Sequence, residues 1–167
     1  MNNAQEYSIR PATTDDVSLI LGFIRELADY ETLLREVTAT EALVRRFMFG
    51  DQPRAEALIG ELGNEPVGFA LFFHNFSTFL ARPGIYIEDI YVRPEFRGRG
   101  YGRAFFTHLS KLAVERGCGR IEWAVLTWNE PAIEFYRNLG ARAMDEWKVF
   151  RLDAASFGRL AREEAPK

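Results

Sequence analysis

A glycine-rich segment with three arginines, Arg97-Gly98-Arg99-Gly100-Tyr101-Gly102-Arg103, separates a predicted strand from a predicted helix. The mostly apolar run from Ile85 to Val92 predicts a strand before it, and the apolar residues between Phe105 and Ala113 recur at helical spacing after it. A further strand is predicted over Ile121 to Leu126. Strand, turn, helix and strand in this order predict a right-handed crossover, and therefore one parallel pair of strands inside the sheet.

The rest of the chain predicts antiparallel strands with helices between them. A capping-box-like spacing at Thr13 and Asp16 begins the first predicted helix, and Gly50 ends the second. We therefore expect an α+β fold with a central, mostly antiparallel sheet and a single domain over residues 1–167. The predicted strands are Tyr7–Arg10, Ala55–Leu62, Val67–Phe76 and Trp147–Leu152, and the first and last predicted helices are Thr14–Tyr30 and Pro131–Leu139.

Charge and cysteine content exclude several classes of protein. The 167 residues contain 21 Lys+Arg against 24 Asp+Glu, so a general basic face for nucleic acid is not expected. The uncharged run 66–81 contains His74, Asn75 and Ser77, so we expect no membrane span. The single cysteine, Cys118, cannot form an intrachain disulfide or a thiolate-rich zinc site, so we expect no metal and a reducing, cytoplasmic location.

The glycine-rich segment has the chemistry of an anion site. The start of a helix offers unpaired backbone N–H groups and a partial positive charge, and glycines let a phosphate approach the backbone closely. Arg97, Arg99 and Arg103 add positive charge and can hold phosphate oxygens in pairs. The alternative is a flexible turn with solvated arginines. The glycine spacing matches neither the Walker motif nor the dinucleotide fingerprint, which disfavours ATP hydrolysis and hydride transfer.

Arg97, Gly100 and Gly102 also follow a known pattern, since their spacing is similar to the acyl-CoA loop of the GNAT superfamily of N-acetyltransferases. The segment from Asn129 to Tyr136, followed by Gly140, resembles the second conserved block of that superfamily. Within it, the chain resembles most the diamine acetyltransferases of the spermidine/spermine type. The matching segments are Arg10-Pro11-Ala12, Glu26-Leu27-Ala28, Tyr30-Glu31, Glu88-Asp89 and Trp128-Asn129-Glu130-Pro131.

The resemblance implies a GNAT fold with acetyl-CoA as co-substrate, its pantetheine arm lying between two splayed parallel strands that end near Val92 and Leu126. Backbone contacts to the pantetheine and thioester fall by position on Ile90, Tyr91 and Val92. A cofactor contact also falls on Asn129, which could equally cap the helix that follows it. The phosphate contacts fall on Arg97, Gly98, Arg99, Gly100, Tyr101, Gly102 and Arg103.

The resemblance also implies catalytic roles. Tyr136 matches the general acid that protonates the departing thiolate, although a tyrosine on the apolar helical stripe with Phe135 could be a core residue instead. Glu88 matches a substrate-site position, where it can capture an ammonium group and assist its deprotonation. The alternative is that Glu88 and Asp89 are two solvated carboxylates. Neighbouring strand residues point to opposite faces unless a bulge intervenes.

The predicted reaction is acetylation of a primary amine by direct attack, without a covalent enzyme intermediate. Acidic and aromatic residues favour a polyamine or diamine acceptor, and the resemblance implies that Tyr30, Glu31, Glu88 and Asp89 contact it. An amino acid with an aminoalkyl side chain, such as thialysine, is an alternative acceptor. Two alternative functions are an acyl-CoA sensor without turnover and a protein N-terminus acetyltransferase. Relatives in the family commonly pair, so a homodimer is expected.

Overall fold

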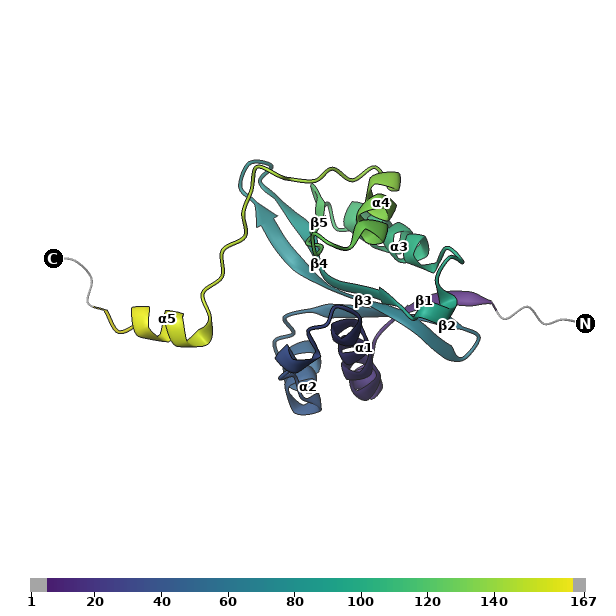
Figure 1. Cartoon of the computed structure of the whole chain (residues 1–167), viewed down its shortest axis with the longest axis horizontal. Helices are drawn as coiled ribbons and strands as arrows, with labels where there is room; N and C mark the ends of the chain where they lie inside the picture. The colour runs from purple at the N-terminus through teal and green to yellow at the C-terminus, as the bar shows by residue number, and fades with distance from the viewer. Residues whose placement is uncertain (1–5, 164–167) are drawn as a thin grey trace, which may run out of the picture. The chain divides into compact units, whose positions relative to one another are not determined.

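The computed structural model describes residues 6–163. The chain forms two compact units, Met1–Leu126 and Thr127–Lys167. The first unit contains a five-stranded sheet with helices on both of its sides (Figure 1). That residues 1–167 form one acetyltransferase domain stays a prediction.

The sheet has the strand order β1-β2-β3-β4-β5. The first four strands pair antiparallel, and β4 pairs parallel with β5. The chain crosses from β4 to β5 through α3 (Tyr101–Glu115), as the strand-turn-helix-strand pattern predicts. The predicted fold class is therefore confirmed. The strands are β1 (Tyr7–Pro11), β2 (Glu56–Leu62), β3 (Glu65–Ser77), β4 (Arg82–Val92) and β5 (Ile121–Trp123).

One side of the sheet is covered by α1 (Val17–Tyr30) and α2 (Glu41–Phe49), and Figure 1 shows α3 on the other side. The fully buried ring of Phe23 on α1 stacks on Phe69 of β3, with 5.3 Å between ring centroids. Phe69 pairs with Tyr91 of β4 and Ile59 of β2, so these residues present one apolar face to α1. Burial of each large apolar side chain contributes about 2 kcal/mol, which holds the middle of α1 against β3 and β4.

On its other face the sheet meets α3 through Phe105 and Leu109, which are both fully buried. Phe105 lies over Gly60 of β2, where a Cβ atom would stand 2.8 Å from its ring. The missing side chain at Gly60 therefore lets α3 pack closely against the sheet.

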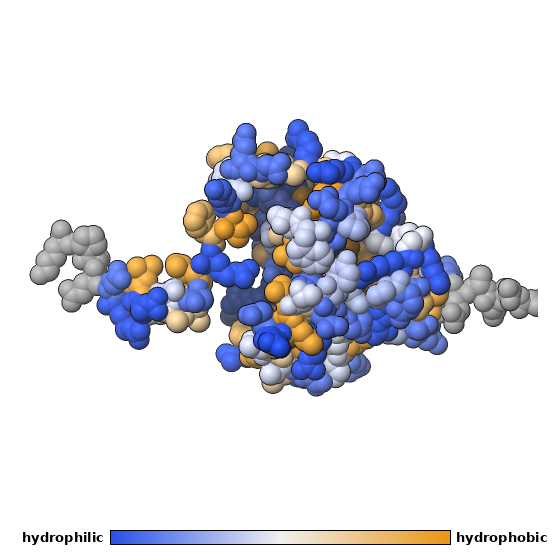
Figure 2. Space-filling view, in the orientation of Figure 1, coloured by the Kyte–Doolittle hydropathy of each residue, from blue (hydrophilic) through white to orange (hydrophobic). Residues whose placement is uncertain are grey.

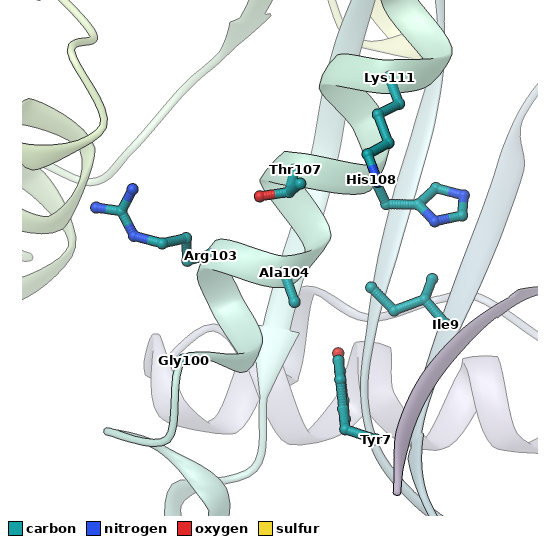
Figure 3. Close-up of a pocket in the computed structure, with 8 residues that line it drawn as sticks. All are labelled: Tyr7, Ile9, Gly100, Arg103, Ala104, Thr107, His108 and Lys111. Atoms are coloured by element: carbon teal, nitrogen blue, oxygen red, sulfur yellow. The ribbon is translucent and has the colours of Figure 1, made fainter.

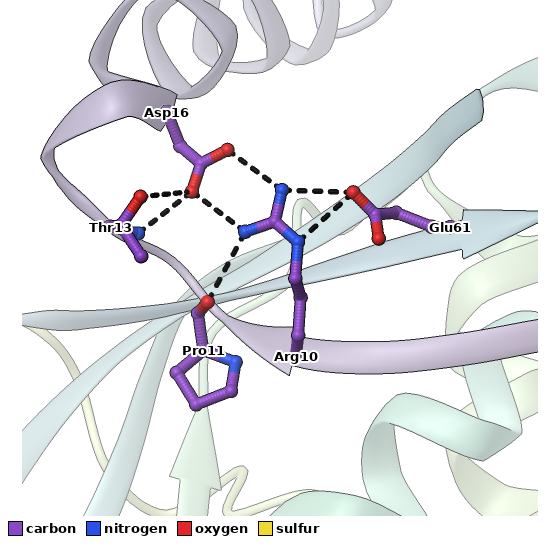
Figure 4. A network of polar contacts seen from close by, with 5 residues as sticks. All are labelled: Arg10, Pro11, Thr13, Asp16 and Glu61. Atoms are coloured by element: carbon purple, nitrogen blue, oxygen red, sulfur yellow. Dashed lines mark hydrogen bonds and ion pairs between the residues drawn. The ribbon is translucent and has the colours of Figure 1, made fainter. Parts of the chain in front are cut away.

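A polar network around Arg10 joins β1 to β2 and to the start of α1 (Figure 4). The guanidinium donates to the two carboxylate oxygens of Asp16 at 2.8 and 2.9 Å and to Oε1 of Glu61 at 2.9 and 3.0 Å. Asp16 also accepts from the Thr13 N–H at 2.7 Å, which confirms the predicted cap before the short 3-10 turn Thr14–Asp16. The hydrogen bonds from Arg10, followed by those from Thr13, hold the Asp16 pKa at about 2.

The second unit contains α4 (Glu130–Asn138) and α5 (Ala154–Leu160). The predicted helix over Pro131–Leu139 is confirmed as α4. The predicted strand over Trp147–Leu152 is wrong, because these described residues have no regular structure. Alternation of apolar and polar residues suits a strand, but a strand also needs a partner for its backbone hydrogen bonds.

The sequence analysis also missed α5. The signal for this helix is Asp153, whose side chain accepts from the Ser156 N–H at 2.7 Å and so caps the first turn. Asp153 followed by Ala154 and Ala155 is compatible with the start of a helix. The helix was not predicted because a strand was predicted directly before it.

Hydrophilic side chains cover most of the face seen in Figure 2, and apolar residues form separate patches among them. In the first unit Phe76, Phe79 and Leu80, around the turn from β3 to β4, are exposed. None of the helices within residues 6–163 has the length and apolar character needed to cross a membrane. Exposed apolar residues of this kind suit protein contacts, but the homodimer stays a prediction.

Candidate active site

The loop between β4 and α3 presents an open backbone. After a short 3-10 turn, Pro94–Phe96, the chain turns through Gly98 and Gly100, with φ of 75° and 87°. A Cβ atom added at either glycine would meet nothing within 4 Å, so space is open above both. Gly100 is the N-cap of α3 and has no side chain to bond the first-turn N–H groups. These groups therefore remain available to an anion.

The loop arginines are held in different ways. Arg97 Nε donates to the Val92 carbonyl at 2.8 Å. Arg99 donates to the Glu95 carbonyl at 3.3 Å, and its guanidinium lies 5.5 Å from the centroid of the Phe96 ring. Arg103, on the first turn of α3, is exposed.

A groove between β1 and α3 shares Gly100 and Arg103 with the loop (Figure 3). It encloses about 490 Å³, and no acidic side chain lines it. In Figure 3 the Arg103 side chain points away from those of His108 and Ile9. The groove and loop together make the N-terminal half of α3 electropositive, which attracts anions. Its lining residues are Tyr7, Ile9, Gly100, Arg103, Ala104, Thr107, His108 and Lys111.

The parallel strands stop pairing before β4 ends. Their register runs from Ile85 opposite Ile121 to Ile87 opposite Trp123, the last residue of β5. The prediction that this strand reaches Leu126 is wrong by three residues, so the residues of β4 after Ile87 extend beyond the end of β5. From Glu88 to Val92, β4 pairs with β3 alone in the five-stranded sheet. Ile90, Tyr91 and Val92 lie in this part of β4, and a splay between the two parallel strands stays a prediction.

Glu88 stands at a β-bulge, directly after Ile87, the last residue of β4 that pairs with β5. Leu71 of β3 pairs with Asp89 and the next residue, Phe72, pairs with Ile87, so Glu88 is an extra residue in β4. A bulge changes the direction of the side chains beside it, so Glu88 and Asp89 are not forced to opposite faces. Glu88 is exposed, whereas Asp89 is half-buried.

Three carboxylates influence one another at this place. Burial raises the pKa of Asp89 to about 6, and the charges of Glu88 and Glu31 contribute to the rise. Burial also raises the pKa of Glu31, which directly follows α1. Within residues 6–163 none of the three forms an ion pair with Arg, Lys or His. Such a site favours a cationic ligand. The sequence could not show the perturbed pKa of Asp89, because it arises from burial and from the distant Glu31.

Tyr30, the last residue of α1, lies against Arg97 of the glycine-rich loop. The Arg97 guanidinium is 4.6 Å from the centroid of the Tyr30 ring and 5.6 Å from that of Tyr91. The structure therefore brings a residue predicted to contact the acceptor next to one predicted to contact the cofactor. The sequence assigned Tyr30 and Arg97 to separate sites and gave no signal for their contact.

Asn129 and Tyr136 belong to the second unit. The Asn129 side chain accepts from the Ala132 N–H at 3.4 Å and caps α4, so its alternative capping role is observed. Tyr136 lies on α4 with its ring centroid 5.5 Å from that of Phe135. The cofactor role of Asn129 and the acid role of Tyr136 stay predictions.

Comparison with known proteins identifies the family. The acetyltransferase (GNAT) family matches residues 23–141, a segment that contains every predicted site residue. A thialysine N-epsilon-acetyltransferase from Sus scrofa is 38% identical over 164 residues, covering 92% of this chain and 96% of that protein. The chain therefore belongs to the acetyltransferase (GNAT) family and is an N-acetyltransferase. Enzymes of this family transfer the acetyl group of acetyl-CoA to an amine.

A further relative and a solved structure are also similar to this chain. A human spermidine/spermine N(1)-acetyltransferase-like protein 1 is 30% identical over 168 residues, covering 95% of this chain and 24% of that protein. The solved structure of an integron cassette protein from V. cholerae has a TM-score of 0.79 at 22% identity, covering 94% of this chain and 98% of the other. This second similarity supports the fold alone.

Proposed function

We propose that the enzyme acetylates a primary amine of a small polyamine or diamine. The observation that carries this proposal is the group of three carboxylates, Glu31, Glu88 and Asp89, without an ion-pair partner among the described residues. Glu88 and Asp89 directly follow the last residue of β4 that pairs with β5. A substrate with more than one ammonium group satisfies several of these carboxylates together, which a monoamine cannot do.

The phosphates of acetyl-CoA bind the loop from Arg97 to Arg103 in this proposal. The positive φ values and the open space at Gly98 and Gly100 support it, because a diphosphate can approach backbone N–H groups there. The backbones of Ile90, Tyr91 and Val92, in the part of β4 that extends beyond β5, hold the pantetheine and thioester. Asn129 adds a contact to the coenzyme. When bound, acetyl-CoA supplies the activated acyl carbon.

The carboxylates capture the amine and take its proton. An alkyl ammonium has a pKa near 10, so at pH 7 only about one molecule in a thousand is neutral, a deficit of roughly 4 kcal/mol. Glu88, exposed at the bulge, attracts the ammonium group and assists its deprotonation through water. Asp89 is a second proton acceptor, because a carboxylate with a pKa of about 6 is a stronger base than an ordinary one.

Tyr136 acts as the general acid. The amine nitrogen attacks the acyl carbon directly, the carbon–sulfur bond breaks, and the Tyr136 hydroxyl donates its proton to the departing thiolate. A phenol with a pKa near 10 stays protonated at pH 7 until the thiolate forms. Cys118 has no part in this route, since it lies in the connection from α3 to β5.

A second acceptor class is favoured by a specific observation. A relative that is 38% identical and matches 92% of this chain is named for thialysine, an amino acid with an aminoalkyl side chain. Its side-chain ammonium suits the same carboxylates.

An assay of free thiol release tests both acceptors. The enzyme is mixed with acetyl-CoA and, separately, with spermidine, putrescine, thialysine or a peptide with a free N-terminus. We expect turnover with spermidine or putrescine. Preference for thialysine selects the second class, and acetylation of the peptide alone selects a protein N-terminus acetyltransferase. Stabilisation by acetyl-CoA without thiol release in any mixture overturns the catalytic proposal and indicates a sensor.

A further inference from the structure

One side chain, that of Arg97, joins three segments of the site. Its Nε donates to the carbonyl of Val92 at the end of β4, and its guanidinium lies over the rings of Tyr30 and Tyr91, at 4.6 and 5.6 Å. Tyr30 ends α1, and Tyr91 is buried within β4. Arg97 itself directly precedes the open glycines of the loop. A movement of this side chain therefore affects the loop, the strand and the helix together.

The end of α1 connects this contact to the carboxylates. Glu31 follows Tyr30 in the chain, and it is close enough to Asp89 for its charge to raise the pKa of that residue. The position of Tyr30 therefore sets the position of one member of the carboxylate group. Arg97, in the glycine-rich loop, contacts Tyr30 through its guanidinium.

The neighbouring Arg99 differs in this respect. Its guanidinium contacts the Glu95 carbonyl and the ring of Phe96, both within the turn that precedes the loop. Arg99 thus adds positive charge to the same loop, and among the described residues it forms no hydrogen bond or cation–ring contact with α1. Substitutions of Arg97 and of Arg99 therefore distinguish the effect of loop charge from the effect of the contact with Tyr30.

We propose that Arg97 is a positioning residue that couples the acetyl-CoA site to the amine site. The inference rests on the proposed function. A diphosphate bound to the loop amides fixes the loop, the fixed loop holds Arg97 on Tyr30 and Tyr91, and Arg97 then holds Glu31 in place for the amine. Because coupling between two binding sites is reciprocal, the amine strengthens coenzyme binding by the same factor.

Calorimetry on the full chain measures the coupling. The amine is whichever of spermidine and thialysine the enzyme acetylates, and its Kd is measured with and without saturating CoA, which has no acetyl group to transfer. We expect CoA to lower the amine Kd roughly two- to fivefold, the range that a cation over an exposed aromatic ring gives. In Arg97→Met the ratio of the two Kd values falls to about one.

Three further variants separate coupling from loss of charge or of folding. Arg99→Met weakens CoA binding but keeps the wild-type ratio. Tyr30→Leu also loses the coupling, and adding Arg97→Met to it changes the ratio no further, because both substitutions remove one contact. Arg97→Lys keeps the charge but cannot bond Val92 while covering both rings, so its ratio lies between those of the wild type and Arg97→Met.

The outcomes distinguish this inference from the proposed function. A wild-type ratio of one, or an Arg97→Met enzyme that keeps the wild-type ratio, overturns the coupling while acetylation of the amine continues. If Arg97→Met does not fold, Arg97→Lys decides, and an unchanged ratio in that variant overturns the inference. A folded wild-type chain that acetylates no amine overturns both proposals.

Discussion

At the scale of single residues, the raised pKa of Asp89 makes it a stronger base but lowers the stability of the fold when the carboxylate is ionised. Burial raises its pKa from 3.8 to about 6. Between these two values the folded chain binds more protons than the unfolded chain, so the free energy of unfolding falls as pH rises through this window. At pH 7 the ionised Asp89 therefore costs stability, while its raised pKa makes it a better base.

We expect Asp89→Asn to stabilise the fold at pH 7 by up to about 3 kcal/mol and to reduce activity, because it removes a buried charge that serves the acceptor site. At pH 4 the gain in stability should nearly disappear. Urea unfolding at both pH values measures the difference, with Asp51→Asn on the exposed surface as the control. Equal effects of Asp89→Asn at pH 4 and pH 7 contradict the assigned pKa shift.

Tyr136 is a prediction at the same scale. Tyr136→Phe keeps the ring and its contact with Phe135 but removes the acidic hydroxyl. We expect kcat to fall roughly 10²- to 10⁴-fold with the Kd for acetyl-CoA unchanged, since loss of a general acid affects the chemical step alone. Tyr86→Phe on β4 is the matched control. Steady-state kinetics together with calorimetry decide, and a fully active Tyr136→Phe enzyme refutes the acid role.

At the scale of elements, the sequence predicts a strand or helix where a strong local signal and a pairing partner agree. The glycines before α3, the cap at Thr13 and Asp16, and the apolar spacing of α1 were sufficient for their elements. The bulge at Glu88 could not be foreseen, because it depends on the register of β4 against β3. The strand predicted over Trp147–Leu152 failed for the related reason that alternation does not provide a partner.

Two glycines test the loop as an anion site. Gly100 and Gly117 both have positive φ, 87° and 66°, and open space where a Cβ would stand, but they lie at opposite ends of α3. Alanine at either position should cost about 1 kcal/mol of stability through backbone strain. We expect only Gly100→Ala to weaken acetyl-CoA binding, at least tenfold, because its methyl group fills the space of the phosphate. Calorimetry and thermal melting report the two effects, and equal coenzyme affinities in both variants count against the loop.

The Arg10 network predicts acid sensitivity where β1, β2 and α1 meet. The Asp16 pKa is lowered from 3.8 to about 2, so its contribution to stability is full above pH 4 and is lost as pH falls towards 2. We expect Asp16→Asn to cost about 2 kcal/mol at pH 7 and much less at pH 2. Urea unfolding across this range measures it, with Asp51→Asn, an exposed change of the same kind, as the control. A cost that does not depend on pH contradicts the assignment to the Arg10 ion pair.

At the scale of the whole molecule, positive and negative charges nearly balance but gather in separate places. The net charge is only −3, yet the segment from Arg97 to Arg103 carries three arginines and the proposed acceptor site carries three carboxylates. Composition alone therefore gave no indication of either site. The resemblance predicted the loop and the pair of carboxylates on β4 from sequence motifs. The contact of Arg97 with Tyr30 and the end of β5 at Trp123 could be seen only in the structure.

Because both proposed sites would attract their ligands by charge, salt should weaken the binding of both ligands. Raising the ionic strength from about 0.05 M to 0.3 M shortens the screening length to near 6 Å, so we expect the KM for acetyl-CoA and the KM for the amine to rise several-fold with kcat little changed. The size of the second effect separates the two proposed acceptor classes. Spermidine carries roughly three positive charges at pH 7, and thialysine carries a net charge of about one.

A polyamine site built on Glu31, Glu88 and Asp89 therefore predicts a markedly steeper salt dependence of KM for spermidine than for thialysine. Glu88→Gln removes one of the three charges and should flatten the spermidine curve while leaving that for acetyl-CoA unchanged. Initial rates across the salt series measure both slopes in one experiment. If the two amines respond equally and Glu88→Gln changes neither slope, the carboxylates do not select the acceptor by charge.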